Sequence, residues 1–301
     1  MWHNPWSLRE GFTIGGGLIF MGLLLQFCVG PVNWTLFTYP ANAVLSGIFL
    51  LLVLALEILR KRFRAIRSLA SWQTTVPALI YAVVLTALMG MTIQLKTAAS
   101  DDPVGLTNML SFWPFVLIYI WMTLIVGMVA VRQLRHVHWR TIPPLLPHLG
   151  LFIILLCGTL GTADMQRLKM YCEMGQPEWR ALDEDNNAHE LPVAIQLNKF
   201  IMEEYTSDRS PKRFASDVEI MTQEGQHIKT TIEVNKPVVA GGWKIYQYGY
   251  DTAMGAQSRY SVFELVRDPW LPIVYAGIAM LALGALLTLF FTSTKRKETA
   301  A

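Results

Sequence analysis

Six long apolar stretches constrain this chain of 301 residues more than any other feature of its sequence. A bilayer core about 30 Å thick needs roughly 20 apolar residues at 1.5 Å per residue in a helix. Stretches of that kind lie at residues 12–31, 42–59, 76–95, 112–131, 143–162 and 269–292. Hydrophobic residues make up 53% of the chain and charged residues only 16%, unlike the composition of a soluble protein. The sequence therefore predicts a polytopic α-helical membrane protein with six spans.

Basic residues in the short loops predict the orientation of these spans, because Lys and Arg are retained on the cytoplasmic side. They gather after the second span, after the fourth span and in the C-terminal tail (Arg60, Lys61, Arg62, Arg64 and Arg67; Arg132, Arg135 and Arg140; Lys295, Arg296 and Lys297). The loops after the first and third spans contain one basic residue, Lys96. We expect a bacterial cytoplasmic (inner) membrane protein with both termini in the cytoplasm and residues 163–268 on the external, periplasmic side. The net charge of only +3 gives no support for a nucleic-acid partner.

The long segment 163–268 has the pattern of a β domain. It contains twelve Lys and Arg and seventeen Asp and Glu, a net charge of −5. Runs of alternating, β-branched and aromatic residues predict strands at 192–201, 214–220, 227–234, 243–248 and 259–266. The polar, acidic stretch 183–190 is expected to form a loop. We predict an antiparallel β-sandwich-like domain between spans five and six, in which Asn235, Pro237 and Gly242 have a structural role in turns.

Few side chains in the predicted spans can carry chemistry. Glu57 lies at the cytoplasmic end of the second span, where Arg60 and Lys61 can neutralise it. His148 is the one histidine in a predicted span, about six residues or roughly 9 Å from its cytoplasmic end. A neutral imidazole in an apolar helix can bind haem iron with one ring nitrogen. The position is equally compatible with a packed histidine that hydrogen-bonds to a backbone carbonyl.

The three cysteines, Cys28, Cys157 and Cys172, form no Cys-x-x-Cys pair. This spacing excludes a thioredoxin-type redox site and a Cys-x-x-Cys-His haem attachment site within the chain. Any redox or haem chemistry must therefore use other residues or a partner protein.

Six ordered blocks over roughly residues 143–292 resemble the ResB (Ccs B-type) family of cytochrome c biogenesis proteins. The blocks are His148-Leu-Gly-Leu-Phe-Ile-Ile-Leu-Leu-Cys-Gly158, Glu190-Leu-Pro-Val193, Phe214-Ala-Ser-Asp-Val-Glu-Ile220, Ile232-Glu-Val-Asn235-Lys-Pro237, Gly242-Trp-Lys-Ile-Tyr246-Gln247 and Val266-Arg-Asp-Pro269-Trp-Leu-Pro272-Ile-Val-Tyr275-Ala-Gly277. No single block would suffice. Their common order is what carries the resemblance.

The resemblance implies a subunit of the system II pathway, which delivers haem across the membrane for covalent attachment to apocytochrome c. The family's transmembrane histidine matches His148, which would be an axial ligand to the iron of haem b in transit. The implied partners are a CcsA (ResC)-type membrane subunit, apocytochrome c and a thioredoxin-like thiol reductant. The chain would then be a non-autonomous subunit of a haem-attachment (synthetase) complex.

Typical members of this family have one pair of spans before the histidine-bearing span, whereas this chain has two. We therefore divide the chain into an extra N-terminal transmembrane hairpin with a basic cytoplasmic loop (1–73), core spans three to five (74–162), an external β-rich domain (163–268), and a C-terminal transmembrane helix with a basic tail (269–301). Two other functions remain open at this stage. The chain could be a scaffold that binds no haem and presents apocytochrome or a thiol reductant to CcsA, or a permease for another solute.

Overall fold

A computed structural model describes residues 6–95, 102, 104–139, 141–205 and 211–298. The chain divides into two compact units. The first, here called the membrane unit, comprises Met1–Asp164 and Trp270–Ala301, and the second, the β unit, comprises Met165–Pro269.

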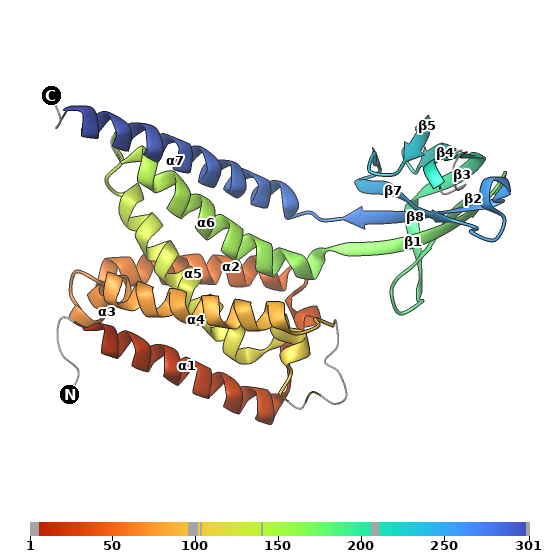
Figure 1. Cartoon of the computed structure of the whole chain (residues 1–301). Coiled ribbons are helices and arrows are strands. Elements are labelled where there is room, and N and C mark those ends of the chain that lie inside the picture. Colours follow the sequence, from red (N-terminus) through yellow and green to blue (C-terminus); the bar gives the residue numbers. More distant parts are fainter. Residues whose placement is uncertain (1–5, 96–101, 103, 140, 206–210, 299–301) are drawn as a thin grey trace. The chain divides into compact units, whose positions relative to one another are not determined.

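Six helices of the membrane unit are long and apolar enough to cross a bilayer, which confirms the predicted multi-pass membrane protein (Figure 1). They are α1 (Leu8–Val29), α2 (Ala41–Leu59), α4 (Trp72–Met91), α5 (Trp113–Leu134), α6 (Ile142–Gly161) and α7 (Leu271–Glu298). Local signals fix several of their ends. α1 begins with a capping box of Ser7 and Glu10, and α5 and α6 have Pro in their first turn, where a missing N–H costs nothing.

Shorter helices occupy the connections between these six. They are the α-helix α3 (Arg64–Leu69) and the 3₁₀ helices η1 (Trp34–Phe37), η2 (Leu106–Ser111) and η3 (Thr162–Asp164). α3 lies in the basic segment that follows α2, and η3 continues directly from the end of α6.

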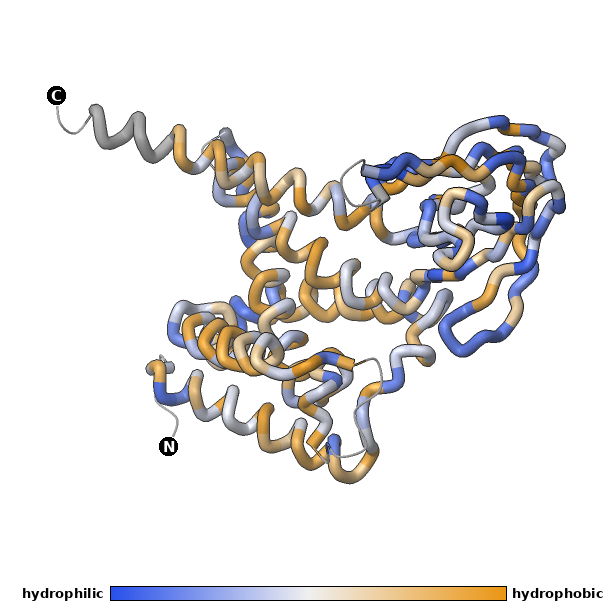
Figure 2. The backbone as a smooth tube through the Cα atoms, turned by 45° about the vertical axis from the view of Figure 1, so that its right-hand side comes forward, coloured by the Kyte–Doolittle hydropathy of each residue, from blue (hydrophilic) through white to orange (hydrophobic). Residues whose placement is uncertain are grey.

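Helix α5 is the central helix of the membrane unit. Half of the residues in its apolar segment are buried, whereas the corresponding share in the other five helices is 11–28%. Its residues contribute to two buried clusters, one with α2 and α6 around Met128 and one with α1 and α4 around Ile118. The outer faces of the helices carry large exposed apolar side chains, and Figure 2 colours these helices mainly as hydrophobic. Such faces suit contact with lipid.

The β unit is a single eight-stranded antiparallel sheet with the order β5-β4-β3-β2-β1-β8-β7-β6. Its strands are β1 (Gln166–Glu173), β2 (Pro177–Leu182), β3 (Ala188–Glu204), β4 (Pro211–Thr222), β5 (His227–Glu233), β6 (Val238–Ala240), β7 (Trp243–Tyr250) and β8 (Tyr260–Arg267). The short 3₁₀ helix η4 (Gly255–Gln257) lies between β7 and β8. The prediction of an antiparallel β domain is confirmed, although the strands form one sheet and not two.

This sheet folds over on itself to enclose a core. The hydroxyl oxygens of Ser216 on β4 and Ser261 on β8 are 2.7 Å apart, although three strands separate β4 from β8 in the sheet. The enclosed side chains are apolar and include Met170, Ile195, Ile220, Ile245, Phe263 and Leu265, none of which is measurably exposed. The curled sheet thus encloses an apolar core between its two halves, as the two sheets of a sandwich would.

Two features of the β unit differ from the sequence-based expectation. β1 and β2 were not predicted, although Leu168, Met170 and Cys172 alternate in β1 and are buried. The stretch 183–190 is not simply a loop, because residues 188–190 pair with β2. Its tight turn is held by Asp183, whose carboxylate accepts hydrogen bonds from the backbone of Asp185 and Asn187. The side chains of Asn187 and His189 bond to the same carboxylate. The acidic stretch 183–190 therefore contains the tight turn of the hairpin between β2 and β3.

Candidate functional site

The candidate histidine, His148, lies in the first half of α6, one residue after a proline inside the helix. Pro147 has no N–H, so the carbonyl of Pro143 four residues earlier loses its intrahelical donor. The hydroxyl of Thr288 on α7 lies 3.2 Å from that carbonyl and 2.8 Å from the carbonyl of Gly284, and the two carbonyls share its one proton. The second helix thus compensates for the proline, and α6 continues unbroken through the histidine.

The imidazole of His148 has one nitrogen held and the other without a protein partner. Nδ1 lies 2.6 Å from the carbonyl oxygen of Pro144, one turn earlier in α6. A carbonyl can only accept, so Nδ1 donates its N–H, and in the neutral form of the ring this leaves the lone pair on Nε2. Nε2 has no hydrogen-bond partner among the residues that the structure describes. This is the arrangement by which metal-binding histidines are oriented in proteins.

The histidine shares its helix face with residues that contact α5 and α2. His148, Phe152 and Leu155 are spaced at i, i+4 and i+7, which places them on one side of α6. The ring of Phe152 stacks on Phe49 of α2, with centroids 6.4 Å apart. A side chain at Gly127 of α5 would collide with the ring of Phe152, with only 2.6 Å to its nearest atom. The Tyr119 hydroxyl of α5 donates to the carbonyl of Leu155 at 2.8 Å.

The opposite face of α6 packs closely against α7 through glycines. A Cβ atom at Gly150 would lie 2.5 Å from the carbonyl oxygen of Gly277, and one at Gly284 would lie 2.3 Å from Pro147. Small residues allow two helix backbones to approach each other closely in a membrane. α6 is therefore clamped between α7 on one side and α5 with α2 on the other.

The sequence analysis missed a polar network at the N-terminal ends of α2 and α7 and the C-terminal end of α6. The carboxylate of Asp164 accepts hydrogen bonds from Asn42 Nδ2 at 2.8 Å, from the indole N–H of Trp270 at 2.7 Å and from the backbone N–H of Tyr39 at 2.7 Å. Asn42, which is fully buried, also donates to the carbonyl of Leu160 on α6. The available signal was an asparagine in an otherwise apolar span.

At the C-terminal ends of α2 and α5, Glu57 forms a buried ion-pair cluster. Its Oε1 accepts from Nη1 of Arg60 at 3.1 Å and from Nε of Arg132 at 3.4 Å. The expected pair with Arg60 is present, and the second partner comes from α5 and not from Lys61. The sequence could not show this contact, because the two residues are 75 positions apart.

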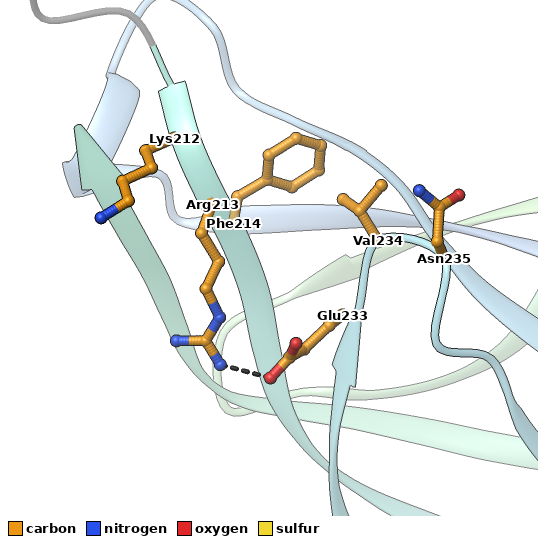
Figure 3. A pocket seen from close by; sticks show the side chains of 6 residues that line it. All are labelled: Lys212, Arg213, Phe214, Glu233, Val234 and Asn235. Carbon is orange, nitrogen blue, oxygen red and sulfur yellow. Dashed lines mark hydrogen bonds and ion pairs between the residues drawn. The ribbon is translucent and has the colours of Figure 1, made fainter. Parts of the chain in front are cut away.

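The three predicted turn residues lie in or beside the connections that flank β6. Asn235 has a left-handed backbone with φ 63°, Gly242 has φ 80°, and Pro237 directly precedes β6. A cavity of about 290 Å³ lies beside this turn, lined by Lys212, Arg213, Phe214, Glu233, Val234 and Asn235 (Figure 3). None of the three predicted turn residues lies in the same unit as His148.

The charges around this cavity are paired with one another. Arg213 forms ion pairs with Glu233 and with Glu203, and Lys236 contacts the other oxygen of Glu233 at 2.9 Å. Arg213, followed by Lys236, lowers the pKa of Glu233 to about 2. The guanidinium of Arg213 is thus already occupied by two carboxylates, which leaves the cavity no unpaired arginine for an anionic ligand.

Among the described residues, no three His, Cys, Asp or Glu side chains are grouped so that they could hold a metal ion. A haem iron differs in this respect, because its porphyrin supplies four ligands and the protein needs to add one from each side. Nε2 of His148, which has no hydrogen-bond partner among the described residues, fits that requirement.

Six apolar helices together with a curled antiparallel sheet define a polytopic membrane protein that carries a β domain. Residues 136–258 match the model of the ResB-like family, and this stretch contains His148 and the three predicted turn residues. The resemblance to this family is therefore confirmed over this region.

Two characterised relatives show how far the similarity extends. Cytochrome c biogenesis protein CcsB of Prochlorococcus marinus subsp. pastoris is 34% identical over 106 residues, which is 35% of this chain and 23% of that protein. Protein NrfI of Wolinella succinogenes is 30% identical over 100 residues, which is 33% of this chain and 11% of that protein. The matched part of this chain thus spans a quarter or less of the length of these relatives.

A solved structure, the cytochrome c heme lyase CcmF, has a TM-score of 0.35 and 11% sequence identity to this chain. The match covers 83% of this chain and 45% of that one. A likeness of this size does not indicate a common fold.

Proposed function

We propose that this protein is a ResB-type subunit of a system II cytochrome c biogenesis machine. It carries haem b across the bacterial cytoplasmic membrane and supports the covalent attachment of haem to apocytochrome c. It acts with a CcsA-type membrane subunit, which supplies the second axial ligand. A thioredoxin-like thiol reductant is a further partner, because the chain has no Cys-x-x-Cys pair with which to reduce the apocytochrome.

The observation that carries this proposal is the state of the His148 ring. Nδ1 is held by the carbonyl of Pro144, and Nε2 is free to donate its lone pair. The ring is half-buried and set on an apolar helix of membrane-spanning length, within the region that matches the family model. Haem bound there would be held by one protein nitrogen without the burial of a charge, and it could leave when the partner offered stronger ligation.

The test is haem occupancy in the complex with the CcsA-type partner. His148→Ala should lower the Soret absorbance per protein at least about tenfold, the lower end of what changes beside a metal ligand cost. Holocytochrome yield should fall in parallel, and free imidazole should restore part of the absorbance. His136→Ala is the matched control, because His136 is exposed in the loop before α6. Unchanged absorbance and yield in His148→Ala would favour the scaffold that binds no haem.

The proposed orientation places both termini in the cytoplasm and the β unit on the periplasmic side. It is supported by the basic residues that follow the C-terminal ends of α2 and α5, because Lys and Arg are retained on the cytoplasmic side. Single cysteines at the exposed positions Arg62 and Glu224, in a chain with Cys28 replaced by Ser, test it in intact cells. A membrane-impermeant maleimide should label Glu224→Cys and leave Arg62→Cys unlabelled until the cells are opened. The reverse pattern would show that the orientation is wrong.

A further inference from the structure

The Glu57 cluster contains hydrogen-bonding groups that the described protein atoms leave unused. Glu57 is only 3% exposed, and its Oε1 accepts from both Arg60 and Arg132. Nε of Arg60 and Nη2 of Arg132 are buried and have no hydrogen-bond partner among the described residues, nor has Oε2 of Glu57. The side chains of Arg60 and Arg132 are 29% and 31% exposed, so the cost falls on these two buried atoms. A buried N–H is costly unless a ligand or water accepts from it. The cluster is therefore incomplete as the chain alone forms it.

The missing group is an anion, as the charges of the cluster indicate. Two guanidinium groups face one carboxylate, which leaves one positive charge in excess. The adjoining segments cannot neutralise it, since residues 58–71 and 133–141 contain no Asp or Glu. Water could fill the space and accept a hydrogen bond, but it would not balance the charge. A carboxylate or phosphate does both, and arginine is the side chain best suited to bind either.

This cluster lies near the level of His148 in the membrane unit. Phe152 marks a common level, because it contacts Phe49 of α2 and Gly127 of α5. From that level toward the cytoplasmic end, His148 is four residues away, or roughly 6 Å by helical rise. In the same direction Arg132 is five residues from Gly127, or roughly 7.5 Å, and Glu57 is eight residues from Phe49, or roughly 12 Å. By this count Arg132 lies roughly 1.5 Å beyond the histidine on its cytoplasmic side, and Arg60, eleven residues from Phe49, lies roughly 10 Å or about two helical turns beyond it.

We propose that Arg60 and Arg132, aligned by Glu57, bind the carboxylate of a ligand that lies beside His148 in the membrane. The inference rests on the proposed function, under which this carboxylate is a propionate of the haem bound at Nε2. Haem carries both propionates on one edge of its ring. Iron at His148 and a propionate at Arg132 would point that edge toward the cytoplasm, with the apolar edge in the bilayer. The N-terminal hairpin, through α2, thereby supplies half of the site.

The same oxygen chemistry is available from a lipid phosphate, so the experiment must separate the two sources. Full-length protein in complex with its CcsA-type partner, in nanodiscs of phosphatidylcholine, is titrated with haem and with haem dimethyl ester, and binding is followed by the Soret band. The ester keeps the iron and the ring but has no carboxylate. Arg132→Gln should weaken haem binding about tenfold, as expected for loss of one charged hydrogen-bond pair. Binding of the ester should change by less than about twofold, since it cannot form that pair.

The matched control is Arg135→Gln, which removes the same charge from an exposed position three residues away and should leave both affinities unchanged. Arg132→Gln leaves Glu57 paired with Arg60, so the remaining cluster is neutral and holds no uncompensated charge. The second variant, Arg60→Gln, leaves the Glu57–Arg132 pair and is neutral in the same way. It should show the same selective loss of haem binding as Arg132→Gln.

The outcomes separate this inference from the proposed function. If His148→Ala abolishes binding and Arg132→Gln does not weaken haem binding, the carboxylate site is wrong and the function stands. An equal loss of haem and ester affinity in Arg132→Gln would also overturn the site, since the effect would be structural. If the wild-type protein binds neither compound, or binds them independently of His148, the proposed function itself is wrong and the inference falls with it.

Discussion

The two units of this protein place their large apolar side chains in opposite ways. In the β unit Phe263, Leu265 and Ile245 are completely buried within the curled sheet. In the membrane unit Phe20, Leu51 and many similar residues are more than 60% exposed on the outer faces of the helices. The buried positions there include Gly150, where two backbones meet, and polar residues such as Asn42 and Glu57.

This difference teaches which force holds each unit together. In water, burial of apolar surface drives folding, so the β unit depends on its core. Inside a bilayer the lipid is as apolar as leucine, and helices associate through close packing and hydrogen bonds. The clamp around α6 is of this second kind: Gly150 against Gly277, Gly127 against Phe152, and Asn42 with Asp164. The position of His148 therefore depends on small and polar residues.

The largest expected effect comes from shortening one leucine in each unit. Leu265→Ala should lower the free energy of unfolding of the β unit by about 2–5 kcal/mol, because the buried side chain leaves a cavity. Leu286→Ala, at a position 54% exposed on α7, should change the stability of the membrane unit by less than about 0.5 kcal/mol. Hydrogen exchange of β8 and SDS titration of helical circular dichroism measure the two values in full-length protein. Equal losses would contradict the contrast.

Replacing a closely packed glycine on α6 with a larger residue should destabilise the membrane unit and leave the stability of the β unit unchanged. Gly150→Leu places a side chain where the backbone of α7 lies within 3 Å, and should destabilise the membrane unit by about 1–3 kcal/mol. Gly158→Leu is the matched control on the same helix, because nothing lies within 4 Å of its Cβ position. SDS titration should separate the two variants, with hydrogen exchange of the β unit unchanged in both. A similar midpoint for both variants would show that the α6–α7 contact is not close.

The contrast also explains what could be predicted from the sequence. Helix existence follows from length and hydropathy, so all six apolar helices were found, and alternation revealed five strands. The joint position of His148, Phe152 and Phe49 was not accessible, because lipid-facing and protein-facing apolar residues look alike in a sequence. β1 was overlooked although its buried residues alternate with Lys169 and Tyr171, the same pattern that revealed the other five strands. Arg132 was assigned only to topology, since nothing local links it to Glu57.

A smaller effect is expected at the turn between β5 and β6. Asn235 has φ 63°, a conformation that costs an ordinary residue roughly 1–2 kcal/mol. Asn235→Ala should therefore destabilise the β unit by about 1 kcal/mol, while Asn235→Gly should be neutral within a few tenths. Hydrogen exchange of β5 and β7 provides the measurement. If Asn235→Ala instead lowered haem content per folded molecule, the turn residue would have a role beyond backbone geometry.

The smallest effect concerns the ion pairs on the surface of the β unit, and it depends on pH. The pKa of Glu233 is lowered from 4.5 to about 2 by Arg213 and Lys236. A carboxyl group whose pKa is depressed on folding stabilises the protein above its unfolded pKa, and that contribution disappears as the pH falls through the folded value. The contribution of Glu233 should therefore be complete above about pH 5 and lost between about pH 4.5 and 2. Glu233→Gln should be slightly less stable than wild type at pH 7, and the two should converge toward pH 2.

Because this pair is partly exposed, 0.5 M NaCl should reduce the difference at pH 7, whereas salt should leave the loss in Leu265→Ala unchanged. Parallel stability curves from pH 7 to pH 2 would show that the carboxylate of Glu233 has no influence on folding.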